Sequence, residues 1–219
     1  AKSGKFIFEE IKFFLQSNNF ITEKWNSLNI LNQNASSVGC VDLGLLSFNE
    51  TSNYLFFDKL TNNQFKVLFL IGSDNIEINK NEEFIIYQGS HGDKGAEIAD
   101  IVLPSPAYTE QEGLYINLEG RVQECKKASY PPGESIEDWK IFNLISNKLF
   151  NDNLFNDQQT IRNEVLKLIP GFVKINDLPE NKLVNNNKKE TEFTSEKISI
   201  KKIDYYFTNS ISRASKTMA

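Results

Sequence analysis

The chain has 219 residues, enough for one α/β domain of ordinary size or for a domain with tails. Its 24 basic and 29 acidic residues give a net charge of -5, which argues against the broad basic surface that nucleic-acid binding requires. The longest wholly apolar run, residues 67–71, is far shorter than the roughly 20 residues that span a bilayer. We therefore expect neither a nucleic-acid partner nor a direct membrane span.

The first part of the chain predicts two helices. Residues 6–20 place apolar side chains such as Ile7 and Ile11 at three- and four-residue steps, on one helical face. Residues 22–38 indicate a second helix, with Thr22 as its N-cap and apolar side chains along one side. Both helices precede the first expected strand.

Three short apolar runs predict the strands of one sheet. Residues 65–71 end in a Gly-Ser-Asp-Asn turn, residues 83–87 repeat the pattern, and residues 101–103 lead into Pro104 after a helical turn at 95–99. Strands that are apolar throughout are typical of a parallel sheet buried on both faces. The predicted fold class is therefore α/β, a layered and mostly parallel sheet with flanking helices.

Two more helices are expected in the second half of the chain. Ser135 and Asp138 have capping-box spacing, and apolar residues continue at helical steps from 139 to 149. The Asn- and Asp-rich residues 151–157 should end this helix. Residues 161–169 predict the second helix.

Composition divides the chain into an α/β domain at 1–180, a linker or exposed loop at 181–199 and a docking tail at 200–219. The linker is dominated by Asn, Lys, Glu and Thr, which bury too little apolar surface to offset the entropy of ordering. In the tail, Arg213 is available for an ion pair or a carbonyl contact. The apolar residues expected to dock the tail are Ile203, Tyr205, Tyr206, Phe207 and Ile211.

Two glycines, Gly113 and Gly120, interrupt sequence that otherwise predicts β-strands. We expect Gly113 and Gly120 to take positive φ or to allow close backbone contact, because both break runs of β-type residues.

Catalytic and metal-binding patterns are scarce. Cys40 and Cys125 lie far apart in the sequence, whereas iron-sulfur and zinc sites need clustered ligands. We expect free thiols, although a disulfide stays open as an alternative. His91 is the only histidine and is interpreted as a structural loop residue. Neither a Gly-rich dinucleotide fingerprint nor a phosphate-binding loop is present.

Five acidic residues lie close together in the sequence and could supply paired carboxylates for acid-base chemistry, but a solvated surface is the preferred interpretation. We therefore expect no catalytic, cofactor-binding or metal-binding residues on this chain. The five residues are Asp93, Glu97, Asp100, Glu110 and Glu112.

Residues 99–121 carry the most informative pattern. Ala99-Asp100-Ile101-Val102-Leu103-Pro104 is followed by Glu110, Gly113, Asn117, Glu119, Gly120 and Arg121. This resembles the molybdopterin oxidoreductase superfamily, whose members carry Ala-Asp-x-Val-Leu-Pro and then Glu-x-x-Gly-x-x-x-Asn-x-Glu-Gly-Arg.

Within that superfamily, the sequence is similar to the large iron-sulfur subunit of respiratory complex I. The supporting segments occur in the same order and cover most of the chain. They are residues 86–93, 103–121, 131–141 and 204–219, with a weaker one at 26–44.

Two departures limit what the resemblance carries over. The cysteine-rich, ferredoxin-like domains of that family have no match in this sequence. Ile76 stands where molybdenum enzymes of the superfamily carry the proline of a cofactor-binding Gly-x-Asn-Pro turn. The resemblance therefore implies a retained molybdopterin oxidoreductase-like fold whose cofactor site is empty.

The resemblance implies a scaffold: the C-terminal part of a split subunit, non-catalytic itself, in the peripheral arm of NADH:ubiquinone oxidoreductase. Its partners would be other peripheral-arm subunits, above all the chain that carries the N-terminal part and the iron-sulfur clusters. The implied location is the matrix side of the mitochondrial inner membrane, or alternatively the cytoplasmic side of a bacterial membrane. Two rival functions are a molybdopterin-dependent oxidoreductase domain, which stoichiometric molybdenum or tungsten would favour, and a free-standing binding module, which would be a stable monomer.

Overall fold

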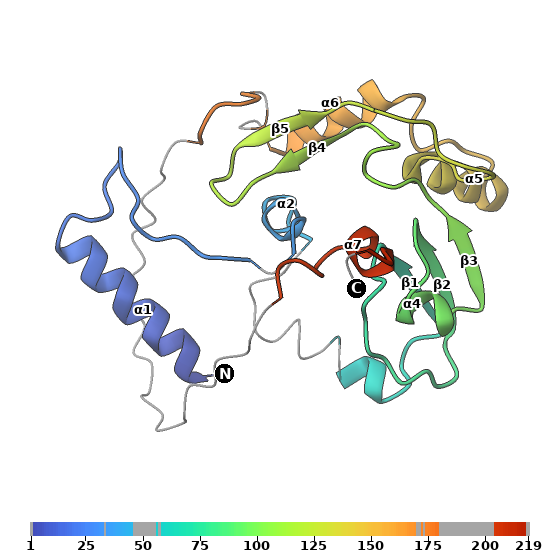
Figure 1. The fold of residues 1–219 in the computed structure, drawn as a ribbon, viewed down its shortest axis with the longest axis horizontal. Coiled ribbons are helices and arrows are strands. Elements are labelled where there is room, and N and C mark those ends of the chain that lie inside the picture. Colours follow the sequence, from blue (N-terminus) through green and yellow to red (C-terminus); the bar gives the residue numbers. More distant parts are fainter. Residues whose placement is uncertain are drawn as a thin grey trace.

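A computed structural model describes most of the chain (Figure 1). The structure describes residues 2–32, 34–45, 56, 58–169, 172, 174–179 and 204–217. The linker predicted at 181–199 and the tail residue Ile203 lie outside these residues.

The first predicted helix is confirmed as α1 (Lys2–Ser17), which lies apart from the sheet (Figure 1). The second, expected at 22–38, is wrong. There, Ile21 and Asn26 form an antiparallel bridge, and the Thr22 hydroxyl accepts hydrogen bonds from the backbone N–H groups of Lys24 and Trp25. Such local side-chain bonds compete with helix formation, and the described helix nearest to this region is the short α2 (Ser37–Asp42).

The predicted parallel sheet is confirmed. It contains β1 (Val67–Ile71), β2 (Phe84–Gly89) and β3 (Ile101–Pro104), in that order and all parallel. The short helix α4 (Lys94–Glu97) lies in the connection from β2 to β3. One face of the sheet forms the main core, made of Leu60, Leu68, Leu70, Ile85 and Tyr87.

Burial on both faces of the sheet, which the apolar runs predicted, is wrong for the described chain. Val67, Phe84 and Ile101 all point to the second face and are exposed. The helix α5 (Asp138–Phe150) covers only part of that face, where the centroids of the Phe142 and Phe69 rings lie 5.7 Å apart.

A second, smaller core follows the sheet. The hairpin of β4 (Gly113–Ile116) and β5 (Val122–Cys125) packs with α6 (Gln158–Leu168) around Ile116, Val122 and Phe172. Asp157 caps α6 by accepting the backbone N–H of Thr160 at 2.7 Å. Both late helices were therefore correctly predicted.

The predicted capping box at the start of α5 is wrong. Glu137, and not Ser135, occupies the N-cap position. The Glu137 carboxylate accepts the Trp139 Nε1–H at 2.9 Å and pairs with Lys140 at 3.2 Å, so it makes no cap bond. The end of the helix is as expected, because Asn151 adopts the left-handed conformation that closes it.

The end of the described chain returns to the sheet as the short helix α7 (Ser210–Ala214) (Figure 1). Cys40 and Cys125 are both free thiols, as predicted. Among the described residues, none of the helices combines the length and the apolar character that crossing a bilayer requires.

Gly113 and Gly120 differ in backbone conformation and in the space around the Cα atom. Gly120 has φ +79, and a Cβ built there would lie 2.9 Å from Pro179 Cγ, which confirms the prediction. At Gly113 the prediction is wrong, because this residue begins β4 without a positive φ and a Cβ would make an ordinary contact of 3.5 Å with the Tyr115 ring.

Gly120→Ala should therefore lower the free energy of unfolding by about 1 kcal/mol or more, because alanine is strained at positive φ and would crowd Pro179. Gly113→Ala is the matched control and should be close to neutral or slightly stabilising. Urea unfolding followed by circular dichroism measures both changes. Equal effects of the two substitutions would contradict the assignment.

Candidate functional site

The candidate site lies where β1 and β2 end. After Ile71 the chain turns at Gly72 and presents Asp74, and after Gly89 a second loop presents Asp93 just before α4. In open parallel sheets, ligands bind in the crevice outside the carboxyl ends of the strands. The two aspartates therefore occupy the edge at which this fold class usually holds a ligand.

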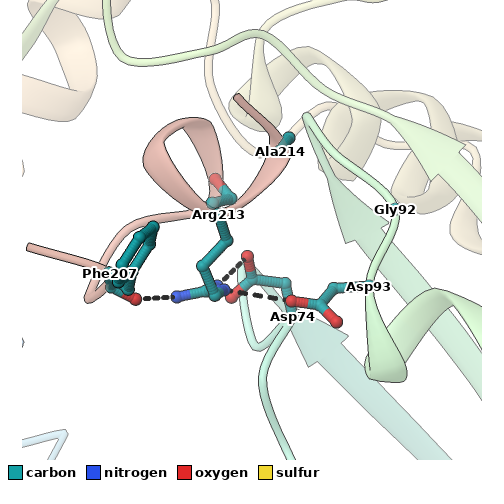
Figure 2. Close-up of a pocket in the computed structure, with 7 residues that line it drawn as sticks. Asp74, Gly92, Asp93, Phe207, Arg213 and Ala214 are labelled. Atoms are coloured by element: carbon teal, nitrogen blue, oxygen red, sulfur yellow. Dashed lines mark hydrogen bonds and ion pairs between the residues drawn. The ribbon is translucent and has the colours of Figure 1, made fainter. Parts of the chain in front are cut away.

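Arg213 of α7 fills the position between the two aspartates (Figure 2). Its Nη2 lies 2.5 Å from Asp74 Oδ2, and its Nε lies 3.0 Å from Asp93 Oδ2. Its Nη1 donates to the backbone carbonyl of Phe207 at 2.8 Å. We call this set of three bonds the arginine clamp. The clamp is largely shielded from water, since the side chains of Arg213 and Asp74 are 18% and 13% exposed.

The tail is pre-shaped for the clamp by its own hydrogen bonds. Asn209 caps α7, accepting the Ser212 backbone N–H at 2.9 Å. The buried Ser212 hydroxyl donates to the carbonyl of Tyr206 at 2.7 Å. These bonds hold residues 206–212 as a compact turn and helix, so Arg213 extends from a fixed point.

Tyr87 supports the second loop of the site: it is buried and donates its hydroxyl to the His91 carbonyl at 2.7 Å. Burial most of all, and then the charges of Asp74 and Asp93, raise the pKa of Tyr87 to about 12, while Arg213 opposes the rise. Gly95 lets α4 approach the turn after β1, since a Cβ there would lie 2.5 Å from the Ser73 carbonyl oxygen.

Asp93 has two roles at this edge. Its Oδ1 accepts the Lys94 backbone N–H at 2.8 Å, which caps α4, and its Oδ2 pairs with Arg213. The Lys94 N–H lowers the pKa of Asp93 most, and the Arg213 hydrogen bond lowers it further, while burial acts in the opposite direction. Asp93 is therefore held as a carboxylate on both of its oxygens.

Three of the five acidic residues that are close in sequence, Asp93, Asp100 and Glu110, have separate side-chain partners in space. Asp100 pairs with Lys80 at 2.6 Å and accepts the Ile85 N–H, and Glu110 accepts the Ala107 N–H at 2.9 Å. The structure brings Asp93 together with Asp74 instead, which the sequence indicated only as part of a turn. His91 lies in the loop above Tyr87, as predicted.

No group of three or more histidine, cysteine, aspartate or glutamate side chains placed to hold a metal ion occurs in the described part of the chain. The cavity beside the clamp has a volume of about 450 Å³. It is lined by Asp74, Gly92, Asp93, Phe207, Ser210, Arg213 and Ala214.

Comparison with known proteins identifies the fold and its relatives. The profile of the family described as Molybdopterin oxidoreductase matches residues 1–148, which is more than half of the chain. The chain belongs to this family. A second profile, which describes the C-terminal part of the NADH-ubiquinone oxidoreductase G subunit, matches residues 174–219 and so includes the whole described tail.

Three curated relatives match nearly the full chain. The NADH-ubiquinone oxidoreductase 75 kDa subunit of Reclinomonas americana is 39% identical over 99% of the chain. The mitochondrial 78 kDa subunit of Candida albicans is 36% identical over 100%, and the NADH-quinone oxidoreductase G subunit of Rickettsia bellii is 38% identical over 99%. The chain spans only 31%, 31% and 30% of these proteins, and it matches their C-terminal part.

The site does not fit the cofactor that gives the molybdopterin oxidoreductase family its name. A pterin dinucleotide carries an anionic pyrophosphate, which favours cations and free backbone N–H donors. The cavity presents two carboxylates and a single guanidinium, and that guanidinium is already paired with both of them. The chemistry that this edge supports is the docking of the chain's own tail.

Proposed function

We propose that the chain is the C-terminal structural part of the large iron-sulfur subunit of complex I, and that it performs no redox step itself. The observation that carries the proposal is the arginine clamp, in which the segment matched by the C-terminal profile occupies the sheet edge that a ligand would use. The edge thereby serves to fix the tail to the α/β domain.

Hydride transfer from NADH, electron relay and quinone reduction then belong to partner chains. Iron-sulfur clusters need clustered cysteine ligands, and this chain has only Cys40 and Cys125. We place the clusters on the N-terminal part of the subunit, carried by a separate polypeptide. The chain would lie on the peripheral arm at the matrix side of the mitochondrial inner membrane, or at the cytoplasmic side of a bacterial membrane.

Purification of the assembly through this chain in mild detergent tests the proposal. The expected result is co-purification of complex I subunits, with this chain as a band distinct from the polypeptide that carries the N-terminal part. Finding the chain only within a single large-subunit polypeptide would refute the split arrangement. Stoichiometric molybdenum or tungsten bound to this chain would favour an oxidoreductase domain instead.

The isolated chain should show neither iron-sulfur absorbance nor NADH oxidation, because it has two cysteines and no dinucleotide-binding fingerprint. Visible spectroscopy after reconstitution with iron and sulfide, and an NADH oxidation assay, check this. The reconstituted assembly is the positive control. A cluster of defined stoichiometry on the isolated chain would overturn the expectation.

A further inference from the structure

The sheet has a second face whose amino half lacks a cover within the described chain. The strand register places seven apolar residues on this face, two or three from each strand, with Ile71 and Leu103 at its carboxyl end. We call the other five the bare face. They are Val67, Phe69, Phe84, Ile86 and Ile101.

Exposure separates this face from the opposite one. Val67, Phe84 and Ile101 are 57%, 43% and 44% exposed, and they begin the three strands of the sheet, Phe84 on the central strand. On the opposite face, the register neighbours Leu68 and Ile85 are 7% and 0% exposed. Both faces are mainly apolar in sequence, but in β1 and β2 the residues that begin the second face are exposed while their neighbours on the core face are buried. On the edge strand β3, Val102 of the core face is 51% exposed.

The helix α5 defines where the bare face begins. Phe142 packs against Phe69, and Asp138 accepts a hydrogen bond from Gln88, so α5 lies over the middle of β1 and the carboxyl half of β2. Ile71, at the carboxyl end of β1 on the same face, is still 51% exposed. Towards the amino ends of the strands, Val67 and Phe84 lie beyond these contacts and are exposed. Ile101, which is level with Phe69 but on the other edge strand, is exposed as well. Among the residues that the structure describes, α5 therefore covers one part of this face and leaves the part beside it exposed.

Parallel sheets of α/β proteins carry helices on both faces, because their strands are apolar on both sides. A contiguous exposed apolar patch on such a sheet marks an interaction site. Because the five residues of the bare face are all apolar, we expect an apolar helical partner and not a charged or nucleic-acid ligand.

We propose that the bare face is the docking surface for the part of the subunit that precedes residue 1 in the relatives, which supplies the missing helical layer. The inference rests on the proposed function and names the surface it uses. The chain spans 31% of the first relative, and its end is matched by the C-terminal profile, so about two thirds of that subunit precedes it. This preceding segment is the partner that covers the bare face.

A binding measurement between this chain and the N-terminal part of the subunit, produced as a separate polypeptide, tests the surface. Phe84→Lys should raise the Kd about tenfold or more, because the substitution removes a large apolar contact and places a charge in the interface. Phe150→Lys is the matched control, since Phe150 is 75% exposed at the end of α5 and outside the bare face. It should leave the Kd unchanged.

Side-chain footprinting with hydroxyl radicals gives a test without substitutions. Phe84 should be oxidised rapidly in the isolated chain and become protected in the assembly, while Phe150 keeps its rate. Slow oxidation of Phe84 in the isolated chain would mean that another segment of this chain covers the face, and it would overturn the proposal.

The binding results distinguish a failure of the proposed function from a failure of the docking surface alone. If the wild-type chain fails to bind the N-terminal part, the proposed function fails and the docking surface with it. If the wild-type chain and Phe84→Lys bind equally, only the surface is wrong. A wild-type dimer that Phe84→Lys dissociates would assign the face to a second copy of the chain and overturn the proposed occupant.

Discussion

Arg213→Ala is expected to release the tail from the sheet edge while the sheet stays folded. The substitution removes both ion pairs and the Phe207 carbonyl bond, and leaves two carboxylates facing each other. Breaking a fully buried pair costs ~3–5 kcal/mol, and partial exposure of these groups brings the expected cost of tail docking to about 2 kcal/mol. Amide hydrogen exchange of residues 212–215 should then accelerate by roughly 30-fold or more.

Two further variants make this result specific. Arg213→Lys should show an intermediate acceleration, because one ammonium nitrogen cannot reproduce the planar guanidinium, whose three nitrogens each reach a separate acceptor. Arg162→Ala is the control, since Arg162 forms a comparable pair with Glu124 at 2.8 Å in the β4–β5 and α6 region. It should leave tail exchange unchanged. Unchanged exchange in Arg213→Ala would mean that the clamp does not hold the tail.

The parallel sheet could be predicted from the sequence because each strand is a short apolar run closed by a turn or by Pro104. The clamp could be predicted only in part. Arg213 was expected to form an ion pair or a carbonyl contact, and it forms both kinds. Its partners Asp74 and Asp93 lie 139 and 120 residues away in the chain, and no local pattern encodes such a distance.

The predicted cause of tail docking was partly wrong. Apolar burial was expected to hold the tail, yet Tyr205 and Tyr206 are both exposed. The ion pairs of Arg213 with Asp74 and Asp93 join it to the sheet instead, while the Ser212 hydroxyl only fixes the shape of the tail. A signal was present in the sequence, because loops that follow neighbouring parallel strands meet at one edge of the sheet. Applied to the turns at Asp74 and Asp93, that rule would have brought the two carboxylates together and called for a cation.

A different kind of polar contact joins α5 to the sheet. Gln88 in the central strand has 0% exposure, and its Nε2 donates to Asp138 Oδ1 at 2.6 Å. The Gln88 Oε1 receives no hydrogen bond from the described residues. Asp138 therefore satisfies the donor side of a fully buried amide, which nothing in the periodicity of the strand predicts.

Asp138→Ala should lower the free energy of unfolding by about 1–3 kcal/mol, because it leaves the buried Gln88 amide without an acceptor. In a Gln88→Leu background the same substitution should cost much less, since no donor is then left unpaired. The control is Asp152→Ala, an exposed aspartate just past α5, which should stay within about 0.5 kcal/mol of wild type.

Urea unfolding of the four proteins in the Gln88 and Asp138 cycle measures the coupling directly. A coupling of about 1 kcal/mol or more would mean that the hydrogen bond fixes α5 on the part of the second face that it covers. Strict additivity would mean that the contact between Phe69 and Phe142 positions the helix alone. In that case, the boundary of the bare face would depend on apolar packing and would shift with substitutions at Phe142.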